Sequence, residues 1–121
     1  MITVIVDRKS EDRSIRGIYV SGHSGYGRTG SDIVCAGIST LCYTAANALE
    51  DICGYDSEQT TVIKESDEDD VFFRITVPET GSEEVKQNAQ VIMRTAELGM
   101  MSVAQLVNDE QNRFVEIIHS N

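Results

Sequence analysis

The segment GHSGYGRTGSDIVC (Gly22–Cys35) separates a strand-like part of the chain from a helix-like part. Before it, Ile15–Ser21 is typical of a strand. After it, apolar residues recur at spacings of three and four from Val34 to Ile52, which is the period of an amphipathic helix. Four glycines in the first nine residues of the segment let it fold back as a loop. The two ends of the loop are therefore predicted to lie close together.

His23 and Cys35 stand at the two ends of this loop, twelve residues apart. A thiol with an imidazole nearby is the pair that nucleophilic catalysis by cysteine requires. A helix that begins near Asp32 places Cys35 in its first turn, where the macrodipole and the backbone N–H groups stabilise a thiolate. We therefore predict Cys35 as a nucleophile and His23 as its acid–base partner.

Further polar and small residues surround the pair. Asp32 either orients the imidazole, as the third member of such a set does, or caps the helix, and the sequence leaves both roles open. Ser39 lies one helical turn after Cys35, where its hydroxyl either donates a hydrogen bond near the thiol or faces solvent. The loop is predicted to close over an extended substrate. The loop residues expected to bind substrate are Gly22, Gly25, Tyr26, Gly27 and Gly30.

Two other kinds of site match parts of the sequence without the context that they need. Gly25, Gly27 and Gly30 have the spacing of a dinucleotide fingerprint, but that motif opens a βαβ unit and binds phosphate, which an acidic chain disfavours. A zinc site needs three or four suitably spaced ligands, and His23, Cys35 and His119 are too scattered. We expect no metal and no cofactor, and we interpret His119 as a residue of the tail.

The composition predicts one domain over residues 1–121, with a formal net charge of −10. That charge opposes direct binding of nucleic acid. It favours a basic partner or simply keeps the protein soluble. The sequence shows no apolar run near the ~20 residues that span a bilayer, and its start lacks the pattern of a signal peptide. We therefore expect a cytoplasmic protein that binds no membrane.

Three cysteines, Cys35, Cys42 and Cys53, are an awkward number for a disulfide framework. On one helix their neighbours would stand ~10 Å or more apart, beyond the ~7 Å that a disulfide bridges. We expect reduced thiols, with Cys42 and Cys53 as packing residues.

The periodicities predict the order β-β-α-β-β-α-β and an α+β fold. This is a single domain with a mixed or antiparallel sheet of about five strands and two long helices packed on one face. The expected helices are Asp32–Cys53, which Gly54 ends, and a second that starts at a capping box of Thr80 and Glu83 and runs to Leu106. The expected strands are Ile2–Asp7, Ile15–Ser21, Thr60–Lys64, Val71–Val77 and Phe114–His119.

An acidic run, Glu65–Asp70, joins the two middle strands. It is interpreted as the solvated tip of a hairpin or, alternatively, as a docking patch for a basic partner.

The motif from Gly22-His23 through Gly25-Tyr26-Gly27 and Gly30 to Asp32-Ile33-Val34-Cys35-Ala36 closely resembles the signature of the ribosomal-processing cysteine protease (Prp) family. The resemblance also covers the length, the order of elements and the acidic character. Ser24 and Gly37 depart from the residues frequent in that family, without removing a catalytic group. By this resemblance His23, Cys35 and Asp32 take the places of the family's histidine, nucleophile and motif aspartate.

The resemblance implies a small cytosolic homodimer that acts in ribosome biogenesis. Members of the family remove an N-terminal extension from a basic protein of the large ribosomal subunit, cutting after a pair of phenylalanines. We therefore expect a thiol protease, a hydrolase that uses no cofactor. The competing hypothesis is a non-enzymatic acidic module that docks on a ribosomal or assembly protein, with Cys35 as a packed thiol.

Overall fold

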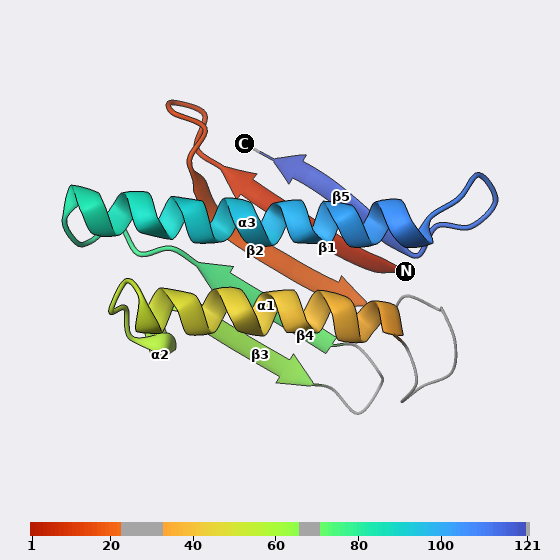
Figure 1. The fold of residues 1–121 in the computed structure, drawn as a ribbon, viewed down its shortest axis with the longest axis horizontal. Coiled ribbons are helices and arrows are strands. Elements are labelled where there is room, and N and C mark those ends of the chain that lie inside the picture. The colour runs from red at the N-terminus through yellow and green to blue at the C-terminus, as the bar shows by residue number, and fades with distance from the viewer. Residues whose placement is uncertain (23–32, 66–70, 121) are drawn as a thin grey trace.

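The computed structural model describes residues 1–22, 33–65 and 71–120 as one sheet with helices across one of its faces (Figure 1). The strand order is β3-β4-β2-β1-β5, in which only the β1–β5 pair is parallel. This mixed sheet confirms the predicted α+β class. The strands are β1 (Ile2–Arg8), β2 (Ile15–Gly22), β3 (Thr61–Glu65), β4 (Val71–Thr76) and β5 (Val115–Ser120).

Two long helices, α1 (Ile33–Asp51) and α3 (Glu83–Val107), lie side by side and run in opposite directions over the sheet (Figure 1). A four-residue helix that the sequence did not predict, α2 (Ser57–Thr60), precedes β3. Asp56 caps it, because its side chain accepts a hydrogen bond of 3.0 Å from the N–H of Glu58.

The core lies between the sheet and the two long helices. Alternate residues of β1 face the helices, so Ile2, Val4 and Val6 are buried while their neighbours are not. The helices contribute apolar side chains at helical spacing to the same layer. Those fully buried from the two helices include Val34, Ile38, Leu49, Met93 and Met100.

α1 ends at Asp51, two residues before the predicted end at Cys53, and Gly54 follows with φ at 75°, in the left-handed region expected of a helix stop. The N–H of Gly54 donates to the carbonyl of Glu50, and that of Tyr55 donates to Leu49. The apolar stripe stops earlier than predicted, since Ile52 is 59% exposed and lies beyond the helix. The stripe of α3 also ends before Leu106, which is 85% exposed.

The predicted capping box at the start of α3 is wrong. Ser82, not Thr80, is the N-cap, and its hydroxyl accepts a hydrogen bond of 3.2 Å from the N–H of Val85. The carbonyl of Thr80 instead accepts a hydrogen bond of 2.7 Å from the hydroxyl of Tyr55. This contact ties the loop before α3 to the end of α1, which is a tertiary effect that local sequence does not encode.

The two long helices approach closely at Gly99 of α3. A Cβ atom at this position would lie 2.7 Å from Cδ2 of Leu41 on α1, which is closer than real contacts allow. The glycine therefore lets α1 and α3 share one face of the sheet.

Candidate active site

Cys35 is the third residue of α1 and lies in its first turn, as predicted. It is half-buried and lines a cavity of about 240 Å³ between α1 and the sheet. The helix macrodipole favours negative charge at this end of α1. The remaining lining residues are mostly apolar; they are Ile2, Val20, Gly22, Ile38, Ser39, Cys42, Tyr43, Ile63 and Phe73.

Strand pairing sets the floor of this cavity. Val20 of β2 pairs with Phe73 of β4, and Phe73 pairs in turn with Ile63 of β3. Residues directly opposite one another in a sheet share a face, so the three side chains form a row beneath α1. The ring of Tyr43 on α1 meets that of Phe73 edge to face, with centroids 5.3 Å apart and planes at 78°.

Ser39 lines the same cavity as Cys35, one turn further along the helix, so the two share a face as predicted. Gly22 is the last residue of β2 and pairs with Ile2 of β1, and its φ is 88°. A Cβ atom there would lie 2.5 Å from the carbonyl oxygen of Met1, so a larger residue does not fit. Gly22 thereby brings the start of the predicted loop to the wall of the cavity.

The other predicted site residues lie outside the described residues. They are His23, Gly25, Tyr26, Gly27, Gly30 and Asp32. The approach of His23 to Cys35, and the choice between the two roles of Asp32, therefore stay predictions. The acidic positions 66–70 also lie outside the described residues, so both interpretations of that run stay open.

The other two cysteines have the packing role that the sequence predicted. All three cysteines lie among the described residues and are thiols rather than disulfides. Cys42 is 1% exposed, and burial raises the pKa of its thiol to about 12. Burial also raises the pKa of Cys53. Both thiols therefore stay neutral near pH 7.

Sequence reasoning missed the aromatic wall of the cavity. Tyr43 stands eight residues after Cys35 and four after Ser39, a helical spacing that would have placed it on the same face. Phe73 and Ile63 gave no such signal, because strand pairing across the sheet decides which side chains meet.

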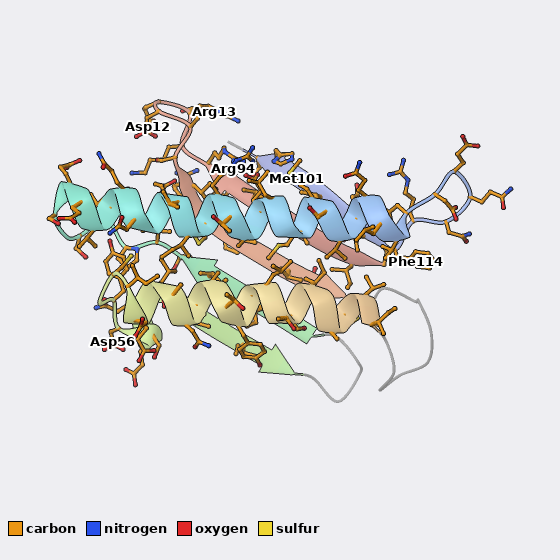
Figure 2. The ribbon with its side chains drawn as sticks, viewed as in Figure 1. Asp12, Arg13, Asp56, Arg94, Met101 and Phe114 are labelled. Atoms are coloured by element: carbon orange, nitrogen blue, oxygen red, sulfur yellow. The ribbon has the colours of Figure 1, made fainter. Side chains whose placement is uncertain are left out.

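A cluster of charges around Glu97 of α3 was also missed. The Glu97 side chain is 0% exposed, and both terminal nitrogens of Arg8 on β1 donate to it. Arg94 donates to the same carboxylate at 2.5 Å, from the side of α3 that faces away from α1 (Figure 2). His119 Nδ1 lies 3.2 Å from Glu97 Oε2. His119 lies in β5, as the predicted strand Phe114–His119 requires, but its contact with Glu97 shows that the interpretation of its side chain as part of a tail is wrong.

The Glu97 cluster connects three elements: β1, α3 and β5. Burial by itself raises the pKa of Glu97, but the hydrogen bonds from Arg8 and Arg94 outweigh it and hold that pKa below its usual range. A paired, buried carboxylate of this kind fixes how the elements meet. It lies outside the cavity of Cys35.

Among the described residues, no group of three His, Cys, Asp or Glu side chains is placed to hold a metal ion. α1 is long and apolar enough to cross a membrane by length and composition alone. Its apolar side packs against the sheet in this fold, which accounts for its hydropathy.

The chain is similar to proteins of one family in sequence and in fold. The family model "Cysteine protease Prp" matches residues 1–112. The ribosomal processing cysteine protease Prp of Staphylococcus aureus (strain Mu50) is 30% identical over 117 residues, which cover 97% of each chain. Its namesake in Bacillus subtilis (strain 168) is 29% identical over 86 residues, 71% of this chain and 72% of that protein.

Solved structures show the same fold. The crystal structure of the S. aureus protease Prp with a covalently linked product peptide superposes with a TM-score of 0.72 at 26% identity, covering 99% of this chain and 100% of that one. SMU.848 from Streptococcus mutans gives a TM-score of 0.71 at 23% identity, covering 99% and 96%. The family match and the close relatives show that this chain belongs to the cysteine protease Prp family and is a cysteine peptidase.

Proposed function

We propose that this protein removes an N-terminal extension from a basic protein of the large ribosomal subunit, with the thiolate of Cys35 as nucleophile. The observation that carries the proposal is the position of Cys35 in the first turn of α1, at the wall of an apolar cavity. The relatives from S. aureus and B. subtilis are named ribosomal processing cysteine proteases, which supports a ribosomal substrate.

The proposed reaction is acyl transfer. The Cys35 thiolate attacks the scissile carbonyl carbon and forms a C–S bond, and the peptide C–N bond then breaks. His23, as imidazolium, gives its proton to the leaving amine. Water then attacks the thioester and gives a proton to His23, which releases the new carboxyl group and restores the thiolate. The covalently linked product peptide in the S. aureus Prp structure supports an acyl-enzyme of this kind.

The cavity supports recognition of an apolar or aromatic residue at the cut. Its walls include Phe73, Tyr43 and Ile63, which bind an aromatic ring by apolar contact and edge-to-face packing. The family resemblance implies cleavage after a pair of phenylalanines, and this lining suits such a residue. Closure of the Gly22–Gly30 loop over the substrate completes the proposed site, with Asp32 either orienting His23 or capping α1.

We also propose that the enzyme acts in the cytoplasm as a homodimer, as the family resemblance implies. Analytical ultracentrifugation tests the dimer, since the sedimenting mass must then be twice that of one chain. The competing hypothesis of a non-enzymatic module is not supported, because the relatives and the family model describe a peptidase.

The test is direct. The purified protein is incubated with large-subunit ribosomal proteins that carry an N-terminal extension, and the products are identified by mass spectrometry. We expect one cut after an apolar or aromatic residue. Cleavage must disappear in Cys35→Ala and in His23→Ala. An unchanged substrate mass with the folded parent enzyme would overturn the proposed substrate.

A further inference from the structure

A second cavity continues the cavity of Cys35 along α1. It encloses about 400 Å³ and shares Tyr43 and Ile63 with the first. Its other described lining residues are Ala46, Asn47, Glu50, Ser57, Glu58 and Thr61. Because Tyr43 and Ile63 belong to both linings, the two hollows adjoin between α1 and β3, and we call them together the α1–β3 groove.

One face of α1 lines the whole α1–β3 groove. Cys35, Ser39, Tyr43, Asn47 and Glu50 follow one another at spacings of four, four, four and three. These spacings keep side chains on one side of a helix. From Cys35 to Glu50 the helix advances by fifteen residues, or about 22 Å at ~1.5 Å per residue.

The opposite wall is an edge of the sheet. β3 is the last strand on its side, and among the described residues no further strand pairs with its outer edge. β3 lies beside α1, with its C-terminal end toward the start of that helix (Figure 1). A strand edge of this kind offers backbone N–H and C=O groups that bind an extended peptide.

The far end of the groove is acidic. Glu50 of α1 and Glu58 of α2 line it from two elements, and both are exposed. Asp56, which caps α2, lies at the same end of the molecule (Figure 2). None of the described lining residues of this second cavity is basic. The end nearest Cys35 is mostly apolar, so the lining of the groove changes from apolar to acidic along its length.

We infer that the α1–β3 groove binds the substrate's extension in extended form, and that its acidic end selects a basic side chain far from the cut. This inference rests on the proposed function, because it takes the extension as the occupant. The groove includes the cavity of Cys35 at one end and carries the carboxylates of Glu50 and Glu58 at the other. An extended peptide covers about 22 Å in six or seven residues at ~3.3 Å each. The basic residue therefore lies six or seven positions before the scissile bond.

The test moves one charge along a cleavable peptide. Peptides that the parent enzyme cuts after an apolar residue carry Lys at one position, from three to nine residues before the cut, and matched peptides carry Gln there. The measured quantity is the ratio of kcat/KM for Lys to that for Gln at each position. Each ratio uses one enzyme preparation, so it does not depend on the active fraction. We expect a maximum of about twofold to fivefold at position six or seven, as exposed ion pairs give.

The double variant Glu50→Gln/Glu58→Gln should lower that maximum to a ratio of about one. The matched control Glu110→Gln/Glu116→Gln removes two exposed charges at or next to β5, the opposite edge of the sheet, and should keep the maximum. A flat profile, a maximum at another distance, or a maximum that survives the Glu50/Glu58 change would overturn the inference.

A binding measurement tests this inference independently of the proposed function. The same peptides, labelled and bound to Cys35→Ala, give Lys-to-Gln affinity ratios by fluorescence anisotropy without turnover. A position-dependent preference in binding, with no ribosomal protein cleaved, would keep the groove and overturn the ribosomal substrate. Cleavage of the ribosomal protein with no preference at any position would keep the proposed function and overturn the groove.

Discussion

The first turn of α1 and its centre carry the same chemical group in two environments. Cys35 is half-buried at the positive end of the helix dipole, and Cys42 is 1% exposed two turns later. Both line the cavity, yet burial holds the pKa of the Cys42 thiol at about 12. Position on the helix therefore separates a thiol suited to chemistry from a thiol suited to packing.

The carboxylates repeat this contrast. Glu50 and Glu58 are exposed at the end of the α1–β3 groove. Glu97 is fully buried and paired with Arg8 and Arg94, and His119 Nδ1 lies 3.2 Å from its carboxylate. The exposed acids are available to a substrate, whereas the buried one holds β1, α3 and β5 together.

The largest expected effect is on activity. Cys35→Ala should lower kcat by about 10³-fold or more, because the variant lacks the proposed nucleophile. Cys42→Ala should retain peptide cleavage, since that thiol stays neutral. Initial rates with one cleavable peptide, on variants that both melt cooperatively, measure the contrast. If both variants lose activity equally, position on the helix is not what separates the two thiols.

The alkylation rates of Cys35 and Cys42 compare the two thiols without a substrate. At pH 7 a thiol of pKa about 12 is ionised in only ~1 molecule in 10⁵, while an ordinary thiol is ionised at about 3%. We expect iodoacetamide to label Cys35 about a thousandfold faster than Cys42. Peptide mapping over time reads the two rates. Raising the pH toward 12 should speed labelling of Cys42 more than that of Cys35, and equal slow labelling at pH 7 would contradict the assignment of Cys35 as a reactive thiol.

Removing the buried charge should weaken the fold. Glu97→Gln leaves Arg8 without its carboxylate partner and should cost about 3 kcal/mol in the free energy of unfolding near neutral pH. Glu84→Gln, on the exposed side of the first turn of α3, is the control and should change stability by less than ~0.5 kcal/mol. Urea unfolding of the three proteins gives the values.

The pH dependence of this cost has a definite sign. The folded pKa of Glu97 lies below its ordinary value of 4.5, so the unfolded carboxyl takes up protons first as the pH falls. The stabilisation is complete above pH 4.5 and is lost as the pH drops through the folded pKa. The difference between the parent protein and Glu97→Gln should therefore shrink below about pH 4.5. A difference that stays constant into acid would mean that the carboxylate charge contributes nothing.

Local patterns predicted the fold class because they encode periodicity. The alternation of Ile2, Val4 and Val6 and the helical spacing after Val34 both appear in the structure. Gly54 acted as the stop that its freedom at positive φ suggests. The cap of α3 was misassigned, because the contact of Tyr55 with the carbonyl of Thr80 depends on tertiary structure.

The candidate site was predictable along the helix and at Gly22, but not across the sheet. Cys35 and Ser39 share a face because their spacing of four residues fixes it. Phe73 and Ile63 reach the cavity through strand pairing, and Glu97 is buried by partners on β1 and β5 that stand far away in sequence. Such long-range pairings leave no signal in the local sequence. From the sequence alone, a buried Glu in an amphipathic helix cannot be distinguished from one that faces solvent.

The smallest expected effect concerns stability at the two thiols. Cys42→Ser puts a hydroxyl into a buried apolar site, which should cost about 1 to 2 kcal/mol. The cost stays in this range because a helical Ser can donate to the carbonyl four residues earlier, as Thr40 and Thr44 do. Cys35→Ser exchanges a half-buried thiol in a first turn, where Ser is well tolerated, and should change stability by less than ~0.5 kcal/mol.

Midpoints of chemical unfolding, measured on both Ser variants and the parent under reducing conditions, test this order. Equal losses at the two positions would mean that Cys35 is packed as firmly as Cys42, and the first turn of α1 would then be an extension of the core. A loss confined to Cys42, together with inactivity confined to Cys35→Ser, would separate the two roles within one helix. Stability would then depend on Cys42, which takes no part in the proposed reaction. Activity would depend on Cys35, which can be replaced with little loss of stability.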